Sequence, residues 1–409
     1  MAPSSVAIFC SNDAMHRNGD QSFPFRQDSD LFALSGLDQL GTILVLCPDA
    51  RQESSREMAF ILPQDPEHAI WNGHRYSTRE ARNVSGIHSV YTTGQWDRIM
   101  TPLLKSVDTI YVNPLKDDTN SHPLTTPNDR MASRLREQYP EHTFLHARAI
   151  LNQRMMIKHK EELTLMQQAI EVTHKAFLQA LHALKPGMKE FELEAELTYT
   201  LSRHGCLHAF EPIVASGSSA CTLHYVRNDR TIRKEDLVLL DFGAEYAYMA
   251  SDVTRTIPAS GRFTKRQREI YMSVLCILDE VTGMMRPGIT LPELNVQTGL
   301  LIDRELVRLK LISPRDLRRQ DPAKPLRRKY FMHGVSHHLG YDVHDKYVRT
   351  TPLKAGMVLT CEPGLYIPEE GIGIRLENDI LITRGKPMIL TRNIPILPDE
   401  IEDLMNTMI

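Results

Sequence analysis

The sequence is poor in cysteine and tryptophan, and its cysteines are far apart. Only 6 of the 409 residues are cysteine and 2 are tryptophan. No C-x-x-C pair occurs, so neither a cysteine-based zinc finger nor, at this chain length, a disulfide framework is expected. We expect reduced and mostly buried thiols at Cys10, Cys47, Cys206, Cys221, Cys276 and Cys361.

The sequence also lacks a long apolar run and an excess of charge of either sign. Met1–Asp20 has no basic start followed by an apolar stretch, so we expect neither a signal peptide nor a membrane span. The formal net charge is only −3, which gives no reason to expect a nucleic acid or a membrane surface as partner. The predicted location is therefore cytoplasmic.

What is present is the composition of a globular protein in a long chain. Hydrophobic residues make up 42% and charged residues 24% of the sequence, as in soluble globular proteins. A chain of this length exceeds one ordinary hydrophobic core, so two domains are expected. The pattern of elements changes near residue 150, and we predict one domain over residues 1–152 and a second over residues 153–409.

The first domain is predicted to be a small α/β domain. Short apolar runs bounded by proline or aspartate alternate with a helical segment, which favours a partly parallel sheet. The predicted strands are Thr42–Cys47, Met58–Leu62 and Thr109–Val112, and the predicted helix is Gln95–Leu104. Polar Gln21–Asp30 is predicted to be a solvated loop, and Lys116–Asn128 a surface excursion.

The second domain repeats one order of elements. Twice, an amphipathic helix, a Pro-Gly stop and a second helix precede an apolar strand that ends in a carboxylate, and another carboxylate-bearing strand follows. The first set is His159–Leu184, Lys189–Arg203, Asp236–Asp241 and Ala250–Ile257. Tyr246–Thr256 is predicted to return beside Asp236–Asp241 as a hairpin. The second set is Thr264–Met285, Pro292–Leu309, Gly356–Cys361 and Gly371–Thr383. A pseudo-two-fold arrangement of the two sets would bring both pairs of acids to one central cleft.

Four acids carry the candidate chemistry. Asp241 and Glu362 end apolar strands, where an unpaired charge is costly. An ion pair with Arg or Lys would explain any single buried acid. Together with Asp252 and Glu377, however, these two acids form a cluster of four carboxylates. Clustered carboxylates repel one another unless a cation neutralises them.

A histidine-rich segment, Tyr330–Asp345, lies between the two pairs of acids. Carboxylates with one imidazole suit a pair of Mn²⁺, Co²⁺ or Zn²⁺ ions. Two such ions, about 3.5–4 Å apart, activate a hydroxide held between them and polarise a carbonyl. His333 and His337 are spaced to share a helical face, but no H-E-x-x-H pattern supports a thermolysin-like mechanism.

These segments resemble the pita-bread metallopeptidase family, and specifically its Xaa-Pro aminopeptidase branch. The resemblance is carried by HGVSHHLGYDVHD, TCEPGLYI, GIGIRLENDI, DFGAEY with SDVTRT, and SSACTLHY. FPFRQDSDLFALSGL and AIWNG resemble the amino-terminal domain of that branch, so the resemblance covers nearly the whole chain. It implies an α/β fold in which a small N-terminal domain precedes a pita-bread catalytic domain, with helices covering a curved sheet.

The resemblance also implies the ligands of two divalent ions, with Mn²⁺ expected and Co²⁺ or Zn²⁺ as alternatives. Asp241 would chelate one ion, Asp252 and Glu377 would bridge both, and His337 with Glu362 would complete the second. Bridging by carboxylates agrees with their chemistry, because an imidazole offers a single lone pair to one metal.

Further residues would act on the substrate by the same resemblance. His344 would stabilise the oxyanion at the scissile carbonyl. His224 and His333 would contact the substrate near the prolyl ring or transfer protons. Arg375 matches a supporting arginine beside the bridging glutamate, and Glu362 would also carry a proton to the leaving nitrogen. Tyr366 matches the tyrosine that follows the glutamate motif.

Simpler structural readings stand beside these roles. His224 is otherwise a core histidine, Trp71 an ordinary core residue and His338 a structural one. In the resembled branch the counterpart of Trp71 reaches the active site of a neighbouring subunit. The basic run Arg315–Lys329 reads as a solvated face. Arg349 is only a candidate for an arginine that the branch places after the histidine motif.

The implied reaction is hydrolysis of the bond between an N-terminal residue and a proline at position two, by a homodimer or homotetramer. That bond has no N–H, so the site must be shaped around the pyrrolidine ring. The nearest alternative is a prolidase, which takes only Xaa-Pro dipeptides. A non-catalytic peptide-binding module is the alternative from another class. Creatinase-like chemistry, which uses no metal, is disfavoured because all five ligand positions hold competent residues.

Overall fold

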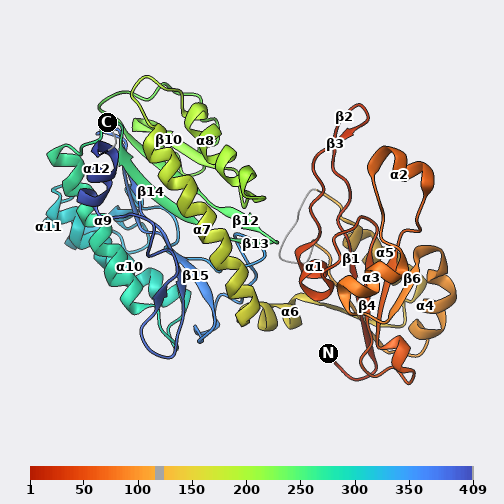
Figure 1. Cartoon of the computed structure of the whole chain (residues 1–409). Helices are drawn as coiled ribbons and strands as arrows, with labels where there is room; N and C mark the ends of the chain where they lie inside the picture. Colours follow the sequence, from red (N-terminus) through yellow and green to blue (C-terminus); the bar gives the residue numbers. More distant parts are fainter. Residues whose placement is uncertain (116–123, 408–409) are drawn as a thin grey trace. The chain divides into compact units, whose positions relative to one another are not determined.

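The computed structural model describes residues 1–115 and 124–407, which form two compact units (Figure 1). One unit is Met1–Asn152 and the other is Gln153–Ile409. Each unit has a hydrophobic core of its own. The predicted surface excursion Lys116–Asn128 lies outside the described residues as far as residue 123, and its end already belongs to helix α5 (Pro127–Gln138).

The first unit contains a six-stranded mixed sheet. Its strands, in order across the sheet, are β6 (Ser89–Thr92), β5 (Glu57–Ile61), β4 (Ile43–Leu46), β1 (Ser5–Cys10), β7 (Thr109–Val112) and β8 (Thr143–His146). β1 pairs antiparallel with β4 and parallel with β7. The predicted partly parallel α/β sheet is therefore confirmed, with the three predicted strands present as β4, β5 and β7.

Helices complete the first unit. They are α1 (Ser29–Ser35), α2 (Pro66–Asn72), α3 (Thr78–Ser85), α4 (Trp96–Leu104) and α5, and α6 (Arg148–Met155) follows β8. α4 confirms the predicted helix, and its Met100 and Leu104 join Met131 and Leu135 of α5 in the core of this unit. Trp71 is 81% exposed, so its reading as a core residue is wrong.

The prediction of a solvated loop at Gln21–Asp30 is wrong at both ends. Gln21–Ser22 forms strand β3, which pairs with β2 (His16–Asn18), and α1 begins at Ser29. Gln27 and Asp30 are buried. The Gln27 amide donates to the carbonyls of Leu37 and Gln39, at 3.0 and 3.1 Å. These polar side chains are buried because partners elsewhere in the unit satisfy them.

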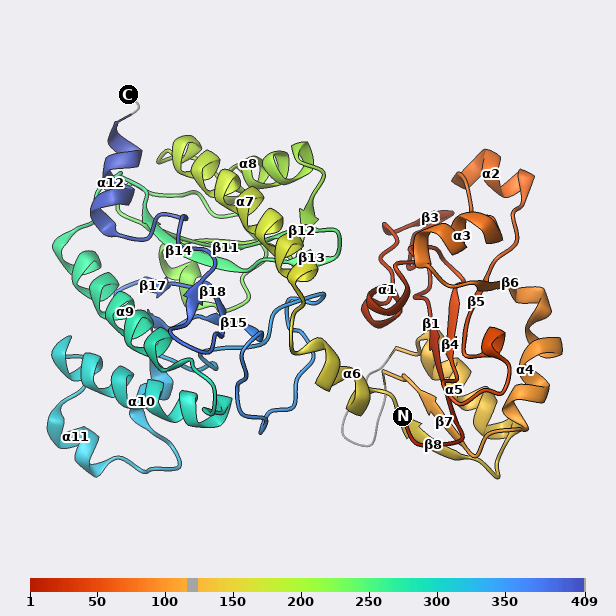
Figure 2. The same cartoon turned by 60° about the horizontal axis from the view of Figure 1, so that its bottom comes forward.

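The second unit has two pairs of long helices. Figures 1 and 2 show α7 (Lys160–Ala183) beside α8 (Glu190–Arg203) and α9 (Lys265–Met284) beside α10 (Leu291–Arg308). α9 and α10 begin at capping boxes on Thr264 and Thr290, which satisfy the free N–H groups of the first turn. α11 (Pro314–Arg319) and α12 (Pro398–Asn406) are shorter.

Both predicted helix stops are present. Gly187 after α7 has φ 96° and Gly288 after α9 has φ 101°. Glycine adopts such angles without the steric cost that a Cβ imposes. The order of helix, stop and helix thus occurs in both halves of this unit.

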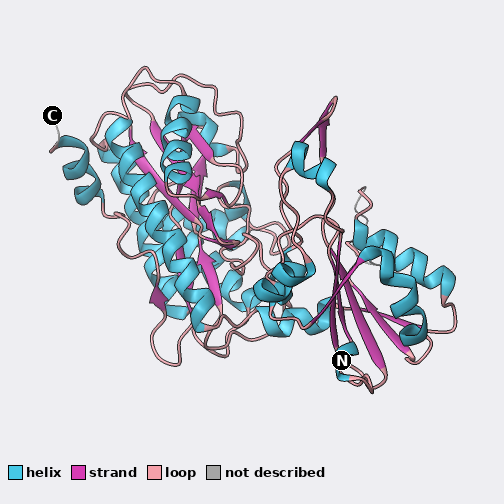
Figure 3. Cartoon of the chain, turned by 45° about the vertical axis from the view of Figure 1, so that its right-hand side comes forward, coloured by secondary structure: helices cyan, strands magenta, loops and turns pink. Residues whose placement is uncertain are grey.

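Short sheets lie between the helix pairs (Figure 3). In the first half they contain β10 (Ile213–Ser216), β11 (Leu237–Phe242) and β14 (Val253–Pro258), with β9 (Leu207–His208), β12 (Ala244–Tyr246) and β13 (Met249–Ala250). In the second half they contain β15 (Val358–Cys361), β18 (Asn378–Leu381) and β19 (Met388–Ile389), with β16 (Gly364–Ile367) and β17 (Ile372–Arg375).

Two strand predictions need correction. The second carboxylate strand of the second half, Gly371–Thr383, is broken into β17 and β18 at Leu376–Glu377. Ala250–Ile257 is likewise interrupted at residues 251–252, so that Asp252 precedes β14 and is not inside a strand. Each break frees the acid from a regular ladder and lets its side chain face the other half. The predicted return of Tyr246–Thr256 beside Asp236–Asp241 is confirmed, because β14 pairs antiparallel with β11.

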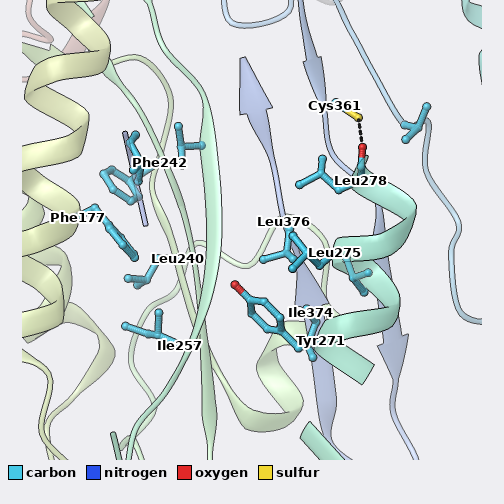
Figure 4. Packing of buried hydrophobic residues seen from close by; sticks show 14 of the residues in the cluster. Phe177, Leu240, Phe242, Ile257, Tyr271, Leu275, Leu278, Cys361, Ile374 and Leu376 are labelled. Atoms are coloured by element: carbon cyan, nitrogen blue, oxygen red, sulfur yellow. Dashed lines mark hydrogen bonds between the residues drawn. The ribbon is translucent and has the colours of Figure 1, made fainter. Parts of the chain in front are cut away.

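The core of the second unit joins helices to strands from both halves. Figure 4 shows Phe177 of α7 near Leu240 and Phe242 of β11, and α9 side chains near Ile374 and Leu376. The Cys361 thiol donates to the Leu278 carbonyl across 4.0 Å. Burying one such leucine or phenylalanine contributes about 1.5–3 kcal/mol.

All six cysteines are free thiols, as expected. Cys10, Cys47, Cys206 and Cys361 are buried, but Cys276 is exposed and Cys221 is half-buried, so the expected burial holds for four of them. Among the described residues, no helix is long and apolar enough to cross a membrane.

Candidate metal centre and active site

The nine residues predicted as metal ligands or as substrate contacts line one cavity in the second unit. The cavity has a volume of about 640 Å³, which is in the range of peptide-sized ligand sites. Its lining includes His224, Asp241, Asp252, His333, His337, His344, Glu362, Arg375 and Glu377. The two acids of each half therefore reach the same space.

The acids reach the cavity from strand ends. Asp241 lies near the end of β11, and Asp252 directly precedes its antiparallel neighbour β14. Glu362 follows β15, and Glu377 fills the break between β17 and β18. The Glu377 N–H donates to the carbonyl of Thr254 at 3.1 Å. This bond places the last acid of the chain beside the strand that carries Asp252.

Asp252, His337 and Glu377 each place one ligand-type atom within 4.8 Å of those of the other two. His337 Nε2 is 3.4 Å from Asp252 Oδ2 and 3.8 Å from Glu362 Oε1. His337 Nδ1 is 3.1 Å from the His338 carbonyl oxygen. Because that oxygen only accepts, Nδ1 is the donor and Nε2 faces the carboxylates.

Asp241 is held differently, by an arginine. Arg375 donates to Asp241 Oδ2, to the Tyr366 hydroxyl at 2.9 Å and to the Thr254 hydroxyl at 3.2 Å. The Tyr366 hydroxyl lies 2.8 Å from His333 Nε2. His333 Nδ1 donates to the Gly334 carbonyl at 2.7 Å, so the tyrosine donates to Nε2. A continuous chain of hydrogen bonds thus runs from Asp241 to His333.

Electrostatic repulsion is high at this centre. Burial, and then the neighbouring Asp241, raises the pKa of Glu377 to about 7. Burial followed by the charge of Glu377 raises the pKa values of Asp252 and Glu362 well above their usual range. Asp379, buried two residues after Glu377, has a pKa raised chiefly by burial. So many buried carboxyls cannot all ionise without a compensating cation.

Unpartnered oxygens show where such a cation fits. Oδ1 of Asp241 and Oδ1 of Asp252, which both line the cavity, have no hydrogen-bond partner within the described part of the chain. Buried oxygens of this kind are rare and need a ligand, water or ion. The donor set of carboxylates with one imidazole suits hard to borderline divalent ions. The residues present therefore fit a divalent metal.

The remaining histidines lie at the wall of the cavity. The His344 ring lies edge-on to that of His337, with centroids 4.4 Å apart. Burial, and then His337, lowers the pKa of His344. Burial, and then Arg375, lowers the pKa of His333 to about 3, so this imidazole is neutral. His224 lines the cavity, which does not fit its alternative reading as a core residue.

The idea of a shared helical face for His333 and His337 is wrong, because residues 331–345 form no helix. An isolated bridge between His338 and Leu359 fixes this segment against β15. The Thr360 hydroxyl also accepts from the His337 N–H at 3.2 Å. His338 is buried, in keeping with a structural role.

Sequence reasoning missed two supporting residues. Arg255 is 1% exposed and donates to the carbonyls of Thr254 and Glu377, at 2.9 and 2.6 Å. Asp379 accepts from the Asp252 N–H at 3.3 Å. Both stand inside motifs quoted above, SDVTRT and GIGIRLENDI. The only available signal was a charged residue in an otherwise buried strand.

Comparison with known proteins identifies both units. Residues 164–384 match the model of metallopeptidase family M24, and residues 1–111 match the aminopeptidase P N-terminal domain. An Xaa-Pro aminopeptidase of Haemophilus influenzae is 33% identical over 421 aligned residues, covering 99% of this chain and 94% of that protein. Human Xaa-Pro aminopeptidase 3 is 30% identical, covering 98% of this chain and 80% of that protein.

The chain is also similar in structure to solved structures of aminopeptidase P. The low-pH form of aminopeptidase P from E. coli has a TM-score of 0.90 and 32% identity, covering 100% of this chain and 95% of that one. A zinc-substituted form of the same enzyme, in complex with product, has a TM-score of 0.89. The resemblance seen in the motifs is therefore confirmed, and the chain belongs to metallopeptidase family M24.

Proposed function

We propose that this protein is a metal-dependent aminopeptidase that hydrolyses the bond between an N-terminal residue and a proline at position two. The observation that carries the proposal is the convergence of Asp252, His337 and Glu377, within 4.8 Å of one another, in a cavity of peptide size. Relatives named Xaa-Pro aminopeptidase that align over nearly the whole chain give the reaction.

Asp241, Asp252, His337, Glu362 and Glu377 would hold two divalent ions, with Mn²⁺ as the proposed metal and Co²⁺ or Zn²⁺ as alternatives. When bound, the ions supply an activated hydroxide at neutral pH and polarise the scissile carbonyl. Asp252 and Glu377, whose carboxylates lie at the meeting of the two halves, would bridge. Arg375 would hold one Asp241 oxygen, leaving the other for metal.

The cavity histidines would act on the substrate. His344 lies beside the proposed ligand His337, with its ring edge-on to that of His337. From this place it would donate a hydrogen bond to the developing oxyanion. Glu362 would receive a proton and return it to the prolyl nitrogen. Neutral His333, oriented by Tyr366 and Gly334, and His224 would contact the substrate near the prolyl ring.

The N-terminal unit favours an aminopeptidase over a prolidase, because residues 1–111 match the aminopeptidase P N-terminal domain. A non-catalytic peptide-binding module is disfavoured, since a binding surface has no need of several mutually repelling buried acids. We also propose a cytoplasmic homodimer or homotetramer.

The proposal is tested with a Xaa-Pro dipeptide and a Xaa-Pro-Xaa tripeptide of the same first residue. Purified protein, stripped with a chelator and supplemented with Mn²⁺, should cleave the tripeptide far faster. Its metal content, measured separately by elemental analysis, should approach two ions per chain, as expected for a dimetal site. Turnover of the dipeptide alone would indicate a prolidase. Full activity in the stripped protein would overturn the metal assignment.

A further inference from the structure

A second cavity, of about 700 Å³, adjoins the candidate active site. It shares His333 and Gly334 with the central cavity. Three arginines line it, Arg327, Arg328 and Arg349, and no acidic residue is among its lining residues. We call it the arginine cavity.

The charge of the arginine cavity is only partly compensated. Arg327 is half-buried and donates to Asp303 at 2.8 Å. The side chains of Arg328 and Arg349 are exposed, and neither has an ion-pair partner within residues 1–115 and 124–407. The expected solvated face at Arg315–Lys329 therefore holds for Arg328 but is wrong for Arg327. A cavity with three guanidinium groups and one carboxylate partner attracts anions.

A glycine in the middle of a helix makes room for this arrangement. Gly299 lies inside α10, where glycine is less favourable than alanine. A Cβ at this position would lie 2.7 Å from Arg327 Nε. The absence of a side chain thus lets the Arg327 guanidinium lie against the helix backbone. Arg327 comes from the short 3-10 helix Leu326–Lys329, which also positions Arg328.

The two cavities suit different parts of a peptide. Asp241, Asp252, Glu362 and Glu377 line the central cavity and would hold the metal ions at which an aminopeptidase places the N-terminal residue and the bond to be cut. The adjoining cavity is lined by arginines and shares His333 and Gly334 with the central one. The rest of the bound peptide, which ends in a carboxylate, can pass these two residues into the arginine cavity.

We propose that the arginine cavity binds a carboxylate of the peptide segment that leaves after cleavage, and that this carboxylate is the C-terminus of a short peptide. Arg328 and Arg349 would be its main contacts, since neither side chain gives up an ion-pair partner in the described part of the chain. The inference rests on the proposed function, because it takes the direction of the bound peptide from it. It makes short peptides with a free C-terminus the preferred substrates.

The test uses peptide pairs with proline at position two and one to four alanines after it. Each length is made with a free C-terminal carboxylate and with a C-terminal amide. We expect one length at which the free acid has a kcat/KM about tenfold above that of the amide, as for a charge-assisted hydrogen bond. The ratio should fall toward one as salt is raised, because salt screens exposed charges.

A third set of peptides separates the two sources of a carboxylate. In these amidated peptides, one alanine is replaced by glutamate. Faster cleavage of the glutamate peptides, with no difference between free acid and amide, would overturn the assignment to the C-terminus and indicate an acidic side chain instead.

Variants test which arginines of the arginine cavity bind the carboxylate. Arg328→Ala and Arg349→Ala should each lower the ratio of acid to amide several-fold, and Arg328→Glu should invert it. Arg318→Ala, an exposed arginine on α11 outside the cavity, is the matched control and should leave the ratio as it is. Equal cleavage of acid and amide at every length would overturn the inference while leaving the proposed function intact. Cleavage of no peptide would overturn the proposed function itself.

Discussion

Lys158 and Asp345 form an ion pair with 2.6 Å between Nζ and Oδ2, and their side chains are 1% and 0% exposed. Lys158 also donates to the Met155 carbonyl at 2.6 Å. A Cβ on Gly340 would lie 2.0 Å from Asp345 Oδ2, so a glycine is needed here. The pair ties the segment before α7 to the residue that follows His344.

Breaking this pair should destabilise the second unit strongly. Lys158→Met leaves the Asp345 carboxylate buried without its partner, which costs about 3–5 kcal/mol. Urea unfolding followed by circular dichroism measures the loss. Arg227→Met, which breaks the exposed pair with Asp229, is the control and should cost less than about 1 kcal/mol. A loss that small for Lys158→Met would contradict the burial of the pair.

Replacing Glu377 by glutamine should have opposite effects on metal binding and on the stability of the metal-free protein. Glu377→Gln should lower metal affinity by more than the 10–100-fold typical of residues behind the ligands. Without metal, the neutral amide removes repulsion from Asp241 and Asp252, so the variant should unfold at higher urea concentration. Elemental analysis and urea titration in chelator check the two effects. Glu171→Gln, an exposed change on α7, should alter neither.

The pH dependence of the metal-free protein follows from the same residue. The pKa of Glu377 is raised to about 7 from its ordinary value. The folded protein then holds a proton that the unfolded chain has released, so raising the pH from 5 to 7 favours unfolding. We expect the metal-free protein to lose stability over this range. In Glu377→Gln this loss should be smaller, and an equal loss in both proteins would assign it to other groups.

Arg255 should prove necessary for the assembly of the centre, although it does not line the cavity. Its guanidinium donates to five acceptors, among them the Pro395 carbonyl at 2.8 Å and Asn378 Oδ1 at 2.9 Å. Arg255→Lys keeps the charge but cannot reproduce the planar set of donors. Buried carbonyls left without donors should cost about 3 kcal/mol or more. Thermal unfolding measures this loss, and exposed Arg262→Lys should shift the transition little.

His344 is predicted to act on the reaction and not on metal binding. His344→Ala should lower kcat about 100-fold, as the loss of one oxyanion donor does, with little change in metal content. His344→Gln, which retains an N–H donor, should recover part of the rate. A metal content that falls together with kcat would instead give His344 a place among the ligands. His182→Ala, on the exposed face of α7, is the control.

Elements with a strong local pattern were predictable from the sequence. β7 spans the predicted Thr109–Val112, and α7 starts one residue after the predicted helix. The break at Leu376–Glu377 was not predictable, because the segment reads as one continuous strand. What interrupts it is the bond from the Glu377 N–H to Thr254, more than a hundred residues away. Local periodicity contains no information on such a contact.

The candidate site likewise contains residues that the sequence predicted and residues that it could not predict. Asp241, Asp252, Glu362 and Glu377 stand in short motifs, and the order of two repeated sets indicated that they would meet. Arg255 could not be assigned, because its partners at Ile394 and Pro395 have no pattern that links them to it. Gln27 is a similar case in the first unit. Its burial depends on carbonyls that only the folded chain brings near.

The bond between Glu377 and Thr254 joins the two halves of the second unit at the centre itself. Metal ions held there would link two halves that are far apart in the sequence. Neither half could bind the metal ions on its own. During synthesis, a complete centre would have to wait until the ribosome has passed Glu377. Any opening that parts the halves would also release the ions, so the rate of metal loss would report on that opening.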